Sequence, residues 1–79
     1  MRTIFDIETD GLLEDLTTCW CIVCRDVDTG EVKTFNPFEI QEGLEMLAKS
    51  DEIIGHNIIN FDLPALHQLY GFEYEGKVT

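Results

Sequence analysis

Long apolar runs are absent from this sequence, and so is any excess of basic residues. No stretch approaches the roughly 20 apolar residues that a membrane-spanning helix needs. Only a few apolar residues separate Arg2 from Asp6, which is too few for a secretory signal. We therefore expect a protein of the cytoplasm with no membrane partner. Five bases against 16 acids give a net charge of −11, which argues against capture of nucleic acid by a basic face.

Cysteine is also scarce, and its three copies are clustered in the segment CWCIVC. Cys19, Cys21 and Cys24 are odd in number, and no fourth ligand follows at a spacing typical of a zinc site. We interpret them as small hydrophobic residues on a strand of a reduced protein. In a regular strand, Cys19 and Cys21 share one face and Cys24 lies on the other.

The 79 residues suffice for one small domain, and the pattern of apolar residues changes once along the chain. The first half reads as an antiparallel meander, because β-branched and aromatic residues are separated by turn-forming segments such as DVDTG. Its three predicted strands span residues 2–8, 17–25 and 31–35.

The second half predicts two helices with a short strand between them. Apolar residues recur at helical spacing in 39–49 and again in 61–71, where Pro64 suits a first turn and Gly71 a stop. The segment 52–57 reads as a strand broken by Gly55, and 74–79 reads as an unstructured stub. The predicted fold is α/β, in the order β-β-β-α-β-α. Its sheet is mixed, because the fourth strand can pair parallel to the first by a crossover connection.

The opening segment FDIETDGL places acids in what otherwise reads as a core strand. Asp6 and Glu8 are two residues apart, so they point to the same face of a strand while Ile7 points to the other. Adjacent carboxylates repel each other unless a cation lies between them, and Mg²⁺ prefers such oxygen ligands. The alternative is that the strand ends at Asp6 and both acids are simply solvated. The spacing alone leaves the two interpretations open.

A second segment, GHNIINFDLPAL, contributes another acid at the junction between the fourth strand and the second helix. Asn57 is followed after three residues by Phe61 and Asp62. If the fourth strand is a parallel neighbour of the first, this junction lies near Asp6 and Glu8. Three carboxylates from distant parts of the chain are then expected to converge.

The segments DIET (6–9) and HNIINFD (56–62) together resemble the first two motifs of the DEDD (DnaQ-like) 3′–5′ exonucleases, which have a ribonuclease H-like fold. The similarity is greatest to the proofreading domain at the N-terminus of phage family A DNA polymerases, and it covers essentially the whole chain. The resemblance therefore implies that residues 1–79 are the N-terminal portion of an exonuclease domain, with a partial ribonuclease H-like fold.

The resemblance also implies the roles of individual residues. Asp6, Glu8 and Asp62 match catalytic residues that bind two ions, Mg²⁺ or Mn²⁺, and the ions promote attack of water on a phosphodiester. Thr9, Asn57 and Phe61 match positions that border or support the site for the single-stranded 3′ end of DNA. The third motif, an Asp with a preceding His or Tyr, has no counterpart, and neither His56 nor His67 fits that role by position.

Two functions follow from this pattern. In the first, the chain is part of a proofreading exonuclease, its partner is the remainder of a DNA polymerase, and it is inactive alone because its catalytic set is incomplete. In the second, it is a small acidic phage protein that keeps half of the exonuclease fold and acts by binding. Such a protein mimics DNA or inhibits a polymerase or nuclease. Either protein would act in the host cytoplasm.

Overall fold

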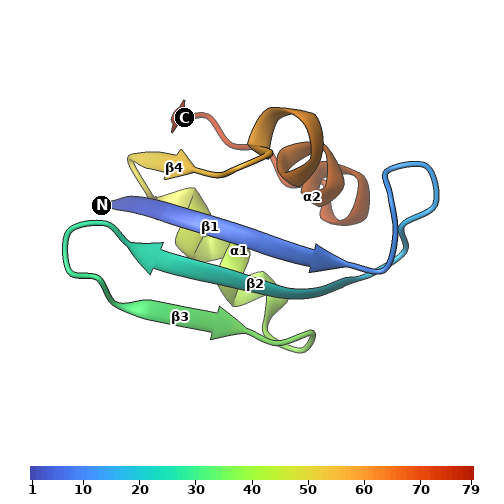
Figure 1. Ribbon diagram of the computed structural model, residues 1–79, viewed down its shortest axis with the longest axis horizontal. Coiled ribbons are helices and arrows are strands. Elements are labelled where there is room, and N and C mark those ends of the chain that lie inside the picture. The colour runs from blue at the N-terminus through green and yellow to red at the C-terminus, as the bar shows by residue number, and fades with distance from the viewer.

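The computed structural model describes residues 1–79 as one mixed sheet with two helices packed on it (Figure 1). Along the chain the elements are β1 (Arg2–Thr9), β2 (Cys19–Asp26), β3 (Val32–Phe35), α1 (Ile40–Lys49), β4 (Glu52–Ile54), the π-helical turn η1 (Ile58–Asp62), α2 (Leu63–Tyr70) and β5 (Lys77–Val78). Neither α-helix has the length and hydrophobicity that a membrane span requires.

The sheet has the strand order β3-β2-β1-β4-β5, with β1 at its centre. β1 pairs antiparallel with β2, and β2 pairs antiparallel with β3, which confirms the meander. The chain then crosses over through α1, and β4 pairs parallel with β1, as the sequence predicts. The predicted α/β class and mixed sheet are therefore confirmed.

The end of the chain differs from the prediction. Residues 74–79 are not an unstructured stub, because Lys77 and Val78 pair parallel with β4 as the edge strand β5. Two contacts explain the order of this segment. The Tyr74 hydroxyl donates a hydrogen bond to the Ser50 carbonyl oxygen at 2.6 Å, and Val78 packs against the hydrophobic core. Single apolar residues in a polar segment are a weak signal, and the sequence analysis missed them.

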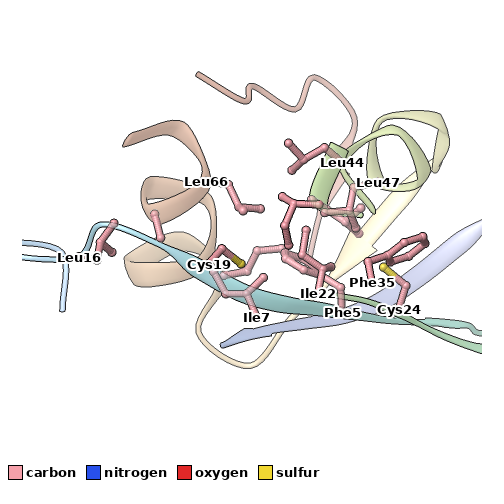
Figure 2. Packing of buried hydrophobic residues seen from close by; sticks show 14 residues of the cluster. Phe5, Ile7, Leu16, Cys19, Ile22, Cys24, Phe35, Leu44, Leu47 and Leu66 are labelled. Carbon is pink, nitrogen blue, oxygen red and sulfur yellow. The ribbon is translucent and has the colours of Figure 1, made fainter. Parts of the chain in front are cut away.

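Both helices lie on the same side of the sheet, where their apolar residues meet those of the strands (Figure 2). The alternation predicted for β1 is present, since Phe5 and Ile7 are buried under the helices. α1 contributes Leu44 and Leu47, and α2 contributes Leu66. The core is thus a single layer, and the opposite face of the sheet carries no helix.

The predicted faces of the cysteines are wrong in one respect. The pairing of β1 with β2 shifts between Glu8 and Thr9, so that Cys21 pairs with Glu8 but Cys19 pairs with Thr9. This bulge inserts one residue and reverses the alternation. Cys19 and Cys24 therefore share the buried face, and Cys21 lies half-buried on the other. The packing role is confirmed for the two buried thiols, whose pKa burial raises to about 11.

Helix α1 approaches the sheet closely because Gly43 lacks a side chain. A Cβ atom at this position would lie 3.1 Å from Cδ1 of Ile22 and 3.1 Å from Cδ2 of Phe35.

We predict that Gly43→Val lowers the free energy of unfolding by about 2 kcal/mol through overpacking. Ala48→Val, at an exposed position of the same helix, is the control and should cost only about 0.5 kcal/mol. Urea denaturation measures both, and equal effects would contradict the close packing.

Candidate active site

Asp6 and Glu8 lie on the face of the sheet that carries no helix. Both are exposed, whereas Phe5 and Ile7 between and beside them are buried on the helical side. The two acids therefore share one face of a strand that continues beyond Asp6, so the strand does not end there, but both acids are solvated, as the alternative interpretation held. Solvation of two neighbouring carboxylates at this position keeps their mutual repulsion small in the absence of a cation.

A gap in the sheet opens beside Asp6. β4 pairs with only three residues of β1 and ends at Ile54, opposite Ile4. Gly55 and η1 occupy the space beside the rest of β1. A Cβ atom at Gly55 would lie 3.2 Å from Oδ2 of Asp62 and 3.5 Å from Cε1 of Phe5. The missing side chain of Gly55 thus leaves a slot that the Asp62 carboxylate occupies.

Asp62 is the one acid of the predicted set that is buried, with 4% of its surface exposed. Burial raises the pKa of its carboxyl above the usual value, and the negative charge of Asp6 raises it further. The His56 side chain acts in the opposite direction. No hydrogen bond is among the causes of the shift. Because no buried side-chain oxygen of the structure lacks a hydrogen-bond partner, the Asp62 oxygens still reach solvent, and the raised pKa reflects the partial loss of water together with the charge of Asp6.

A bound cation would stabilise this arrangement of acids relative to the metal-free protein. The charge of Asp6 makes ionisation of Asp62 more costly, and two neighbouring carboxylates are a donor set for a hard divalent ion. The structure does not bring all three acids into one cluster as the sequence predicts, because no group of three His, Cys, Asp or Glu side chains lies close enough together to hold a metal. None of the three acids lines a surface hollow of the molecule.

The third acid of the opening segment, Asp10, stabilises the loop that follows β1. Its Oδ1 accepts hydrogen bonds from the backbone N–H groups of Thr17 at 2.8 Å and Thr18 at 2.9 Å, and its Oδ2 accepts one from the Thr17 hydroxyl. These bonds lower the pKa of Asp10 to about 2. Asp10 therefore closes the loop between β1 and β2, at the end of the strand that carries Asp6 and Glu8.

No side chain of the three predicted substrate-binding residues, Thr9, Asn57 and Phe61, forms a hydrogen bond with these acids. The Thr9 hydroxyl donates to the Gly11 carbonyl oxygen at 2.8 Å and so belongs to the turn after β1. Asn57 is exposed before η1, and Phe61 is half-buried against the core. The sequence analysis missed the slot at Gly55, the electrostatic role of His56 and the π-helical turn. Pro64, one turn beyond Asn60, was the available signal for that turn.

The raised pKa of Asp62 predicts a stability change with pH. In the folded protein this acid binds its proton more tightly than in the unfolded chain, so stability falls as the pH rises from the unfolded pKa through the raised folded value. We predict that metal-free Asp62→Asn is more stable than the wild type at pH 7. The difference should disappear at pH ~3, below the ordinary Asp pKa of 3.8, where Asp62 is largely protonated in both states. Thermal unfolding at both pH values tests this, and a variant less stable at pH 7 would contradict it.

Comparison with known proteins places this arrangement in a family. The model of the RNase H superfamily matches residues 3–78. A protein named DNA-directed DNA polymerase, from Escherichia phage T7, is 34% identical over 70 residues, which cover 84% of this chain and 10% of that relative. The chain thus spans about a tenth of the relative that it matches. The mixed sheet with its two helices agrees with the family match, and the chain belongs to the RNase H superfamily.

Proposed function

We propose that this chain carries the first two motifs of a proofreading 3′–5′ exonuclease domain and forms the N-terminal part of a phage DNA polymerase. The observation that carries the proposal is the buried Asp62 carboxylate, which lies beside Gly55 and within the electrostatic influence of Asp6. The similarity to a DNA polymerase of phage T7 supplies the context. The substrate in this proposal is the single-stranded 3′ end of DNA.

The proposed ligands of Mg²⁺ or Mn²⁺ are Asp6, Glu8 and Asp62. When bound, such ions polarise a phosphodiester and lower the pKa of water in this class of nuclease. Asp62 is held in place by the core around it, while Asp6 and Glu8 lie on a strand with partners along its length on one side. Carboxylates on rigid elements lose little freedom when a cation binds, which favours a defined site.

The other proposed roles concern the substrate. Thr9 precedes the loop that Asp10 closes, so this loop has a fixed position beside the acids. Asn57 precedes the turn that presents Asp62, and Phe61 lies within it. We assign Thr9, Asn57 and Phe61 to the border of the 3′-terminal nucleotide. With a net charge of −11, the approach of phosphates depends on the metal ions and on positive charge from the rest of the polymerase.

No aspartate follows Asp62 in this sequence, so the fourth acid of the DEDD pattern and its water-orienting partner are missing from these residues. A general base and a complete ligand set are both required for efficient hydrolysis. We therefore expect the 79-residue chain to release no nucleotides by itself.

A chimera tests the proposed function. Residues 3–78 replace the matching residues of the phage T7 polymerase, and release of labelled nucleotides from single-stranded DNA 3′ ends is measured with Mg²⁺. We predict that the chimera is active and that Asp6→Ala lowers its rate by more than about 100-fold. Loss of a metal ligand should lower activity at least as much as loss of a residue that supports the ligand. Glu31→Ala, an exposed acid at the β2–β3 hairpin, is the charge-matched control and should leave the rate unchanged.

Two outcomes would contradict the proposal. A folded chimera without nuclease activity, or one whose activity survives Asp6→Ala, would exclude the assigned site. Nucleotide release by the isolated chain that Asp6→Ala abolishes would instead show that these residues complete a site by themselves. Tight binding of the isolated chain to a polymerase or nuclease, together with an inactive chimera, would favour the alternative function as a small acidic binding protein.

A further inference from the structure

The turn that presents Asp62 is wider than a normal α-helical turn. The Asn57 carbonyl oxygen accepts hydrogen bonds from the backbone N–H of Phe61 at 2.9 Å and of Asp62 at 3.1 Å. The next N–H, of Leu63, donates to the Ile58 carbonyl oxygen, again five residues back. Such π-turns are rare and occur mostly as single turns at functional sites. The turn therefore needs a cause in the sequence.

Pro64 supplies that cause. η1 continues into α2 without a break, so Pro64 lies inside one helical segment that runs from Ile58 to Tyr70. In a continuous α-helix, residue 64 would donate its N–H to the carbonyl oxygen of Asn60. Proline has no N–H, and its ring clashes with the carbonyl group four residues back. A turn with one extra residue moves the Asn60 carbonyl out of this position.

The width of the turn also decides where Asp62 points. Ile58 at the start of the turn and Leu66 beyond its end are both fixed in the core. The extra residue corresponds to about 100° of rotation about the helix axis, because an α-helix has about 3.6 residues per turn. If the same residues formed an α-helix, Asp62 would rotate out of the slot beside Gly55, or Leu66 would leave the core.

We propose that Pro64 is a positioning residue of the site, which enforces the π-turn over Ile58–Asp62 and so holds the Asp62 carboxylate in its slot next to Gly55. The inference rests on the proposed function in one respect, namely that Asp62 binds metal. The geometric part is independent of it, because the hydrogen-bond register of the turn is a property of the metal-free chain.

Two variants of the 79-residue chain test this role. Pro64→Ala removes the clash, and the second variant combines Pro64→Ala with deletion of Ile59, a residue that is 66% exposed and outside the core. NMR couplings across hydrogen bonds report which carbonyl group pairs with the Asp62 N–H. Broadening of signals by Mn²⁺ reports the affinity of the site. Pro37→Ala, at an exposed proline before α1, is the matched control.

In Pro64→Ala, the partner of the Asp62 N–H should change from the Asn57 to the Ile58 carbonyl group. The Mn²⁺ affinity should fall about tenfold, as for other residues that orient a metal ligand. The unfolding temperature should not fall, since alanine is the best helix former. Deleting Ile59 in this background removes the extra residue and should restore wild-type affinity, and Pro37→Ala should change neither measurement.

Several results would overturn the proposal. If Pro64→Ala keeps the Asn57 pairing and the wild-type affinity, core packing alone enforces the turn. If Pro64→Ala unfolds, Pro64 serves the stability of α2 rather than the position of Asp62. If the wild type shows no Mn²⁺ broadening centred on Asp6 and Asp62, the proposed metal function fails, while the couplings still decide whether Pro64 sets the turn.

Discussion

A carboxylate that loses most of its contact with water beside a second acid is the constraint on which the candidate site of this small domain depends. Asp62 is 4% exposed, and both burial and the charge of Asp6 raise its pKa. Keeping such a group ionised costs free energy unless a cation shares the site. A domain of 79 residues has little stability to spare, so a costly acid at this position is best explained by function.

Several local features of the fold surround the acids of the candidate site. The early end of β4 leaves a gap beside β1, and Gly55 leaves room for the carboxylate within that gap. The π-turn directs Asp62 into the slot, while Leu66 on the following helix remains in the core. Asp10 closes the loop that follows Asp6 and Glu8. Each feature departs from regular structure, and all of them lie at the same end of the central strand.

The sequence was sufficient to predict the regular parts of the fold. The apolar alternation around Asp6 and the helical spacing of Leu44 and Leu47 each follow from a period that repeats over many residues. The pairing of motifs also indicated the family. The features that the sequence did not reveal depend on single residues. Val78 and Tyr74 order the last strand, and the bulge in β2 moves Cys19 to the buried face.

In the candidate site, too, some features follow from regular periodicity and others depend on single residues. That Asp6 and Glu8 share a face follows from strand periodicity, and that Asp62 approaches Asp6 follows from the parallel crossover. The burial of Asp62 and the width of the turn depend on how Gly55 and Pro64 pack, which no local pattern encodes. The three acids do not form one compact group in the metal-free chain.

A double-mutant cycle between Asp6→Asn and Asp62→Asn tests most directly whether these two carboxylates form one site. Unfolding free energies are measured at pH 7 in low salt without divalent ions. Because each substitution removes the same repulsion, the double variant should gain less stability than the two single variants together, with a coupling of about 0.5 kcal/mol or more. Added salt should reduce the coupling. Strict additivity of the two effects would show that Asp6 and Asp62 do not interact, and the account of a shared site would be wrong.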